Sequence, residues 1–226
     1  MSWTLCANAD AVAQAACARI LHAAQLAISD RGSFKIVLAG GTTPLLCYRL
    51  LSAAASDWGK WHVYFGDERC LPPSDSQRNS MQAAAALLDR VAIPADQVHP
   101  IPAELGAAPA ARSYTATITG ATPFDLVLLG LGEDGHTASL FPGHTHPEAA
   151  IVVPVYQAPK PPSERVSLNF STLSNSRQIL FLVAGESKKS AVASWRRGDP
   201  LPAAAVRSQA TPEVLIDRSA WGERRL

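Results

Sequence analysis

Residues 124–143 read FDLVLLGLGEDGHTASLFPG, a short and mostly apolar run that passes directly into a glycine-rich loop. A run of this length bounded by glycine predicts a buried β-strand. The same transition occurs in FKIVLA (residues 34–39) before a Gly-Gly pair, in WHVYF (61–65) before GDER, and in QILFLVA (178–184) before GESKK. These strands, each ending in a polar or glycine-rich loop, define the fold that we predict.

Stretches with helical spacing separate the predicted strands. They are residues 10–28, the LLCYRLL run after Pro44, residues 81–90, and the ESKKSAVASWRR run of residues 186–197. Alternating strands and helices are typical of right-handed βαβ units around a parallel sheet. We therefore expect an α/β fold with an open, largely parallel, Rossmann-like sheet flanked by helices, in a single domain over residues 1–226.

Two later stretches fit the same domain. VSLNF (residues 166–170) predicts a further strand, whereas YQAPKPP (156–162) carries three prolines and cannot form a central strand. Strand patterns continue on both sides of the prolines. We therefore interpret this stretch as a loop within the domain rather than a linker.

Composition limits the classes of partner. The chain has 226 residues with 20 Lys+Arg against 19 Asp+Glu, a formal charge of +1, so no global field attracts nucleic acid or an anionic membrane. The first thirty residues contain polar side chains at helical intervals, which we take to exclude a signal peptide or a membrane span and to favour a cytoplasmic protein. Cysteines 6, 17, 47 and 70 form no CxxC pair, which predicts reduced thiols.

Gly40-Gly41-Thr42-Thr43-Pro44 lies where a predicted strand turns into a helix. Glycines accept unusual backbone angles, and proline suits the first helical position. Backbone N–H groups at a helix start, with two hydroxyl groups beside them, can hold a phosphate. The stretch lacks the GK[ST] ending of a P-loop and the GxGxxG pattern of a dinucleotide site, and a simple change of chain direction is the alternative interpretation.

Cationic side chains follow two further strands. Arg69 in GDER and Lys188 in GESKK come at strand ends, where open α/β sheets bind ligands, so both can pair with a phosphate near the Gly-Gly turn. Lys188 and Lys189 stand at a predicted helix start, where positive charge is unfavourable unless an anion binds or solvent screens it. Arg165, beside the proline-rich loop, adds a cation whose place this pattern does not fix.

His136 is the candidate catalytic base, because it lies in the glycine-rich loop at a strand end and two residues beyond Asp134, which can orient it. His144 and His146 follow, but without HExxH spacing or a cysteine partner, so we predict no metal site. No GxSxG elbow surrounds Ser139. Attack by a water molecule that His136 activates is therefore the simpler mechanism.

Five stretches of the chain, from about Phe34 onward, resemble the successive motifs of the 6-phosphogluconolactonase family. In order, they are LAGGTTP, FGDER, LGLGEDGHTASLFPG, PPSERVSLNF and VAGESKK. The resemblance implies an α/β domain related to glucosamine-6-phosphate deaminase. It also implies hydrolysis of the lactone ester of 6-phosphoglucono-1,5-lactone in the oxidative pentose phosphate pathway, in the cytoplasm and without a cofactor. The implied partner is this small phosphorylated sugar lactone, not nucleic acid or a membrane, and we expect a monomer or a homodimer.

The resemblance further implies roles for individual residues. His136 matches the catalytic base, and Asp67 and Asp134 match acidic positions near the sugar ring. Thr42, Thr43, Arg69 and Lys188 match phosphate-binding positions, and Arg165 matches a further anion contact. Together with Gly40 and Gly41 of the same turn, these are the residues that we expect to bind the substrate phosphate.

Two alternatives remain at this stage. A deaminase or isomerase of the related family carries a glutamate five residues after the histidine of its DGH motif, and Phe141 occupies that position here. A sugar-phosphate sensor of a transcription regulator would carry a DNA-binding module ahead of this fold. With the first strand expected near Phe34 and no excess of basic charge, we expect no such module.

Overall fold

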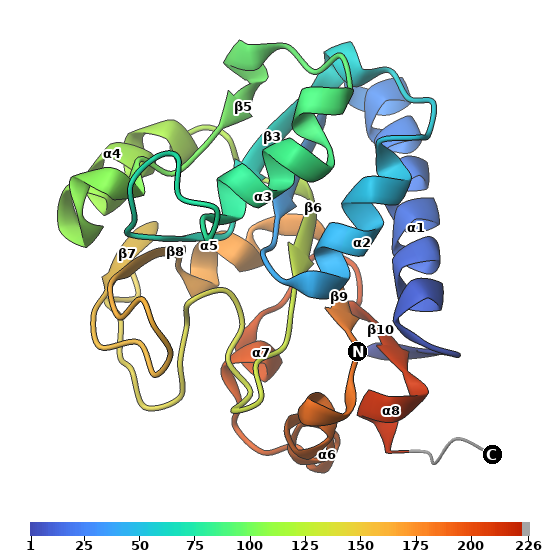
Figure 1. Ribbon diagram of the computed structural model, residues 1–226, viewed down its shortest axis with the longest axis vertical. Coiled ribbons are helices and arrows are strands. Elements are labelled where there is room, and N and C mark those ends of the chain that lie inside the picture. Colours follow the sequence, from blue (N-terminus) through green and yellow to red (C-terminus); the bar gives the residue numbers. More distant parts are fainter. Residues whose placement is uncertain (223–226) are drawn as a thin grey trace.

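A parallel sheet of seven strands forms the centre of the computed structural model, which describes residues 1–222 (Figure 1). The strand order is β1-β10-β9-β6-β2-β3-β5, and every pairing in this sheet is parallel. Its strands are β1 (Ser2–Cys6), β2 (Phe34–Leu38), β3 (Trp61–Phe65), β5 (Val98–His99), β6 (Phe124–Leu129), β9 (Ser176–Val183) and β10 (Glu213–Asp217). The predicted open α/β sheet is confirmed.

A second sheet is small and antiparallel. It has the order β4-β8-β7, from β4 (Asp67–Arg69), β7 (Val152–Val155) and β8 (Arg165–Leu168). The sequence interpretation of GDER as loop was therefore wrong, because these residues pair with a strand almost a hundred positions away. Local patterns carry no signal for a pairing of that range.

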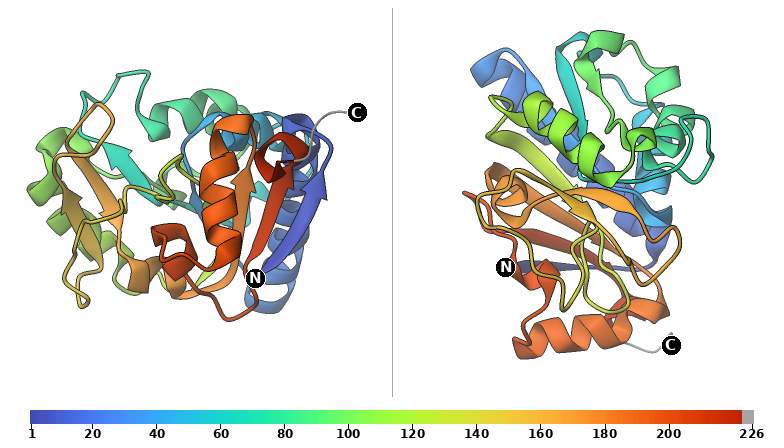
Figure 2. Two further views of the ribbon diagram at one scale, coloured as in Figure 1. Left: turned by 90° about the horizontal axis from the view of Figure 1, so that it is seen from below. Right: turned by 90° about the vertical axis from the view of Figure 1, so that its left-hand side faces the viewer.

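Helices cover both faces of the large sheet (Figure 2). The longer ones are α1 (Ala9–Arg31), α2 (Thr42–Leu51), α3 (Asn79–Ala86), α4 (Ala107–Ile118) and α6 (Lys189–Arg197). The short ones are α5 (Phe170–Ser174), α7 (Pro202–Ala205) and α8 (Arg218–Trp221). Five 3-10 turns complete the described part of the chain, at Trp58–Lys60, Leu88–Arg90, Ala95–Gln97, Ala103–Leu105 and Glu186–Lys188.

Most element boundaries agree with the sequence prediction, and the exceptions have physical reasons. The first strand is β1, not the run at Phe34, because β1 is a half-exposed edge strand with no strong apolar pattern. The predicted strand at residues 166–170 ends at Leu168, since Asn169 caps α5. Helix α2 begins at Thr42, two residues before Pro44, with Gly41 as its cap.

Helix α1 is long and apolar enough to cross a membrane by length and composition alone, which corrects the expectation that its polar residues exclude this. In the fold it packs against α2 and against strands β9 and β10 of the same chain. Its buried side chains are mainly small, including Ala16, Ala24 and Ala27, which lets the helix approach the sheet closely. We therefore interpret α1 as a core helix of this fold.

The four cysteines are free, as predicted, and three of them are buried.

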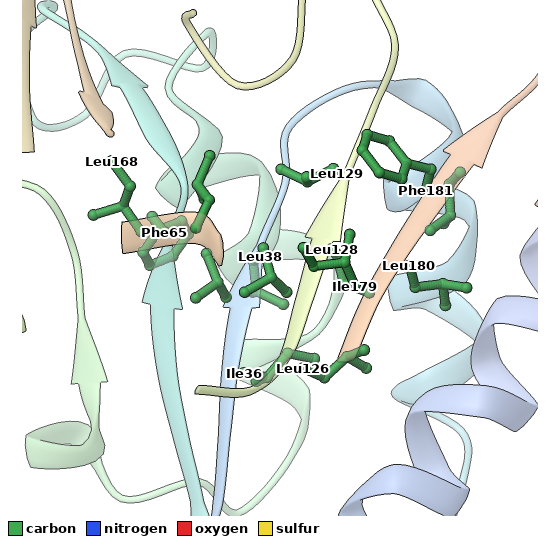
Figure 3. Close-up of a cluster of buried hydrophobic side chains, with 14 of the residues drawn as sticks. Ile36, Leu38, Phe65, Leu126, Leu128, Leu129, Leu168, Ile179, Leu180 and Phe181 are labelled. Carbon is green, nitrogen blue, oxygen red and sulfur yellow. The ribbon is translucent and has the colours of Figure 1, made fainter. Parts of the chain in front are cut away.

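The apolar core lies between the helices and the central strands, where Leu126, Leu128, Ile179 and Leu180 belong to one buried cluster (Figure 3). Strands β6 and β2, at the centre of this cluster, lead directly into the loops that hold polar residues.

Replacement of Leu126 by alanine should lower the free energy of unfolding by about 2–5 kcal/mol, because the leucine is 2% exposed on a central strand. Leu26 on α1 is 44% exposed and offers the same change of side chain at the surface, where the effect should stay within about 0.5 kcal/mol. Urea unfolding of both variants measures the difference. Equal destabilisation would contradict the position of Leu126 in the core.

Candidate active site

A cavity of about 320 Å³ lies at the carboxyl ends of β2, β3 and β6. This is the edge of a parallel sheet at which ligands bind in open α/β folds. Seven of the ten site residues predicted from the sequence line it, namely Gly40, Gly41, Asp67, Arg69, His136, Arg165 and Lys188. The fold thus brings together residues from five separate segments of the chain.

His136 and Asp134 form a short polar contact at the cavity. Nδ1 of His136 lies 2.5 Å from Oδ1 of Asp134, and the same oxygen accepts the backbone N–H of His136 at 3.1 Å. Burial raises the pKa of Asp134, but these hydrogen bonds and the charge of the imidazole outweigh it and lower the pKa below its ordinary value. With Nδ1–H bound to a carboxylate, Nε2 is the nitrogen that can accept a proton.

Glycine is required at position 132 for this contact to form. A Cβ atom there would overlap Nδ1 of His136 and would lie 2.6 Å from Oδ1 of Asp134. The backbone N–H of Gly132 also donates to the carbonyl of His136 at 2.8 Å, which closes the loop on itself. The absence of a side chain at Gly132 therefore fixes where the imidazole lies.

Asp67 enters the cavity from β4 and is 7% exposed. Its Oδ2 accepts the hydroxyl of Ser139 at 2.6 Å, and its Oδ1 accepts the side-chain amide of Asn79 at 3.1 Å. Ser139 is fully buried beneath the cavity. Its hydroxyl thus orients a carboxylate, which agrees with the prediction that it is not the nucleophile of an elbow motif.

Arg69 and Arg165 are direct cross-strand partners on β4 and β8. Arg165 donates to the carbonyls of Lys160 at 2.8 Å and Pro162 at 3.1 Å, and burial lowers its pKa although Asp67 opposes this. Arg69 donates to the carbonyl of Gln77, and within residues 1–222 its buried Nε has no hydrogen-bond partner. Like charges placed opposite each other are unfavourable, so this pair favours an anion between or beside the guanidinium groups.

Lys188 and Lys160 add further positive charge to the cavity lining. Burial lowers the pKa of Lys188, with Glu133 opposing this shift and Lys160 adding to it. Lys160 itself pairs with Glu133 at 3.0 Å in an exposed salt bridge. Four cations thus line one cavity of a chain with a formal charge of only +1.

The Gly-Gly turn supplies backbone donors. Gly40 and Gly41 line the cavity, and α2 starts at Thr42 without a side-chain cap, so its first N–H groups have no partner within the helix. Thr42 is exposed and Thr43 is 8% exposed, and neither side chain lines the cavity. Asp134 also lies outside the lining and reaches the cavity through His136.

Sequence reasoning missed Asn79, Lys160 and Phe141 as parts of the cavity lining. Asn79 falls in the polar stretch after GDER, where no motif distinguishes it from its neighbours. The centroid of the Phe141 ring lies 4.6 Å from the centroid of the His136 ring and 5.6 Å from the guanidinium carbon of Arg165. Only the fold brings these side chains together.

Within residues 1–222, no group of three His, Cys, Asp or Glu side chains could hold a metal ion. The rings of His144 and His146 lie 6.4 Å apart beside Phe141 and contribute no third ligand. The cavity lining combines four cations with one imidazole, that of His136.

Residues 7–216 match the family model described as glucosamine-6-phosphate isomerases/6-phosphogluconolactonase. The 6-phosphogluconolactonase of Mycobacterium tuberculosis is 38% identical in an alignment that covers 94% of this chain and 94% of that protein. This chain belongs to the 6-phosphogluconolactonase family.

Solved structures of the family agree in fold. The 6-phosphogluconolactonase of Thermotoga maritima superposes with a TM-score of 0.89 at 29% identity over 96% of this chain and 99% of that one. The enzyme of Trypanosoma brucei gives a TM-score of 0.87 at 25% identity over 98% and 97%. A monomeric glucosamine-6-phosphate deaminase, at 22% identity and a TM-score of 0.83, shares the fold alone.

Replacement of Gly132 by alanine should break the contact between His136 and Asp134, because the new methyl group would occupy the place of the imidazole. ¹⁵N chemical shifts of the ring report the tautomer. The natural protein should hold neutral His136 with its proton on Nδ1, and the variant should lose this preference. Gly130→Ala is the matched control, since a Cβ atom there meets nothing within 4 Å. A natural protein with its proton on Nε2 would contradict the assignment.

Proposed function

We propose that this chain hydrolyses the lactone ester of 6-phosphoglucono-1,5-lactone by a water molecule that His136 activates. The names of its relatives support the lactonase activity, and the geometry of His136 supports the mechanism. The observation that carries the proposal is the contact between Nδ1 of His136 and Asp134 in a cavity lined by four cations. An oriented imidazole and an anion-binding wall are what this reaction needs.

In the proposed mechanism, Nε2 of His136 takes a proton from water as the water oxygen attacks the lactone carbonyl. The tetrahedral intermediate then collapses, the ring C–O bond breaks, and the imidazolium returns the proton to the departing ring oxygen. Asp134 holds the ring in the required tautomer and stabilises its transient positive charge. All groups that move protons in this scheme belong to His136 and water, so no cofactor takes part.

The phosphate of the substrate would bind between the Gly40-Gly41 turn, Arg69, Arg165 and Lys188, all of which line the cavity. Charge-assisted hydrogen bonds from guanidinium and ammonium groups are strong, and backbone N–H groups at the start of α2 add to them. Thr42 and Thr43 are the first two residues of α2, next to this turn, and remain proposed phosphate contacts through that position. Asp67 would face the sugar ring from β4.

A deaminase or isomerase is the second candidate, and Phe141 argues against it. This residue is 3% exposed and packs against His136, in the place where the related enzymes carry a glutamate. A buried aromatic ring cannot move the proton that ring opening requires.

Among residues 1–222 the free thiols also fit the cytoplasmic location that we propose for this step of the oxidative pentose phosphate pathway.

The first test is the reaction itself. Proton release from freshly made 6-phosphogluconolactone, corrected for spontaneous hydrolysis, should be accelerated by the protein, and His136→Ala should lower kcat by about 10²–10⁴ while the fold is retained. Circular dichroism provides the folding control. Near-normal turnover by folded His136→Ala would remove this residue from the mechanism, and ammonia release from glucosamine 6-phosphate at a comparable rate would favour the deaminase.

The phosphate contacts are tested with two substrates. Arg69→Ala and Lys188→Ala should each lower kcat/KM for the phosphorylated lactone by roughly one to two decades, because each removes a charge-assisted hydrogen bond. Unphosphorylated gluconolactone should be a much poorer substrate, and the two variants should barely change its rate. If both substrates slow by the same factor, these residues serve the ring chemistry or the structure.

Catalysis should also survive metal removal. Exhaustive dialysis against a chelator should leave kcat unchanged, because imidazole rather than a Lewis acid activates the water in this mechanism. Loss of activity on chelation, with recovery on adding zinc, would instead indicate a metal site at His136, His144 and His146. Their rings neighbour one another in sequence with Phe141, which lies between His136 and His144.

A further inference from the structure

Asn79 is a cavity residue to which neither the proposed mechanism nor the motif pattern gives a role. It is the first residue of α3 and is 4% exposed. Its Nδ2 donates to the backbone carbonyl of Asp67 at 3.0 Å and to the Asp67 carboxylate at 3.1 Å. On its other side the amide lies against Gly40, where a Cβ atom would overlap it. Asn79 therefore lies between the strand that carries Asp67 and the Gly-Gly turn.

Glu68 fixes Asn79 from behind. Neighbouring residues of a strand face opposite sides, so Asp67 and Arg69 line the cavity while Glu68 is fully buried. The Glu68 carboxylate accepts the backbone N–H groups of Asn79 at 2.7 Å and Ser80 at 2.8 Å, and the Ser80 hydroxyl at 2.7 Å. Helix α3 has no side-chain cap of its own, so this distant carboxylate caps it.

The Glu68 carboxylate is itself well satisfied. It also accepts the backbone N–H of Arg69 at 2.8 Å and lies 3.6 Å from Nε of Arg78, which is 3% exposed. A buried charge with this many partners is costly to disturb, so the start of α3 is held rigidly against β4. The position of the Asn79 side chain is consequently fixed before any substrate arrives.

We propose that Asn79 is a positioning residue that orients the Asp67 carboxylate toward the substrate; the inference rests on the proposed lactonase function. Ser139 holds Oδ2 of Asp67 and Asn79 holds Oδ1, so together they fix the plane of the carboxylate. Its remaining lone pairs can then accept a hydroxyl of the sugar ring. Without Asn79, the carboxylate can rotate about its Cβ–Cγ bond and this direction is lost.

The kinetic test compares substitutions at one position. Asn79→Ala should lower kcat/KM for the phosphorylated lactone about tenfold to a hundredfold, the usual effect of losing a hydrogen bond to a charged group. Asn79→Asp has nearly the same size but replaces the donor by a second carboxylate facing Asp67, so the loss should be at least as large. Natural kcat/KM in folded Asn79→Ala or in folded Asn79→Asp would overturn the proposal.

Gln82→Ala is the matched control on the same helix. The Gln82 amide donates to the carbonyl of Ser76 at 3.0 Å and does not line the cavity, so this variant should keep natural activity. Thermal unfolding verifies that each variant is folded. Asn79→Ser, which keeps a polar group at the start of α3 but is too short to bridge to Asp67, replaces Asn79→Ala if the latter unfolds.

A double-mutant cycle separates positioning from a general structural effect. Affinity for 6-phosphogluconate, measured by calorimetry, should fall on Asn79→Ala in the natural background and should not change further in an Asp67→Ala background. An equal loss in both backgrounds would overturn the role of Asn79 through Asp67. If the natural protein does not hydrolyse the lactone, the proposed function fails; if it does and Asn79→Ala hydrolyses it equally well, only this inference fails.

Discussion

The parallel register of the central strands is the constraint on which the site depends. Leu38 of β2 pairs with Phe65 of β3, and Leu129 of β6 pairs with Phe181 of β9, so these strands end at nearly the same level. Loops separated by many residues in the chain therefore leave the sheet side by side. Because the sheet is buried between helices, its register is strongly specified, and the positions of these loops are specified with it.

The small antiparallel sheet supplies the arginine pair of the site. It crosses the edge of the cavity and places Arg69 directly opposite Arg165, two charges that repel unless an anion or a carboxylate lies nearby. Asp67 on the same strand partly compensates them. A chain with almost no net charge thus concentrates positive charge at one point, which allows it to select an anionic ligand without a global field.

Three acidic residues near the cavity have different roles in the structure because their surroundings differ. Asp134 is partly exposed and contacts an imidazole, Asp67 is buried between a hydroxyl and an amide, and Glu68 is fully buried among backbone N–H groups and Arg78. Their side chains carry the same functional group. The first orients an imidazole, the second faces the cavity, and the third holds a helix in place.

The sequence by itself determined the strand-to-loop transitions, the parallel α/β class, and the grouping of His136, Arg69 and Lys188 at strand ends, because these follow from local periodicity and glycine positions. Only the tertiary structure decided that Asp67–Arg69 form a strand with β8, that Glu68 caps α3, and that Asn79 contacts Asp67. Those contacts join residues distant in the chain or buried by packing. The energies of those contacts depend on which groups lie close together in the folded protein, and no local sequence pattern specifies this.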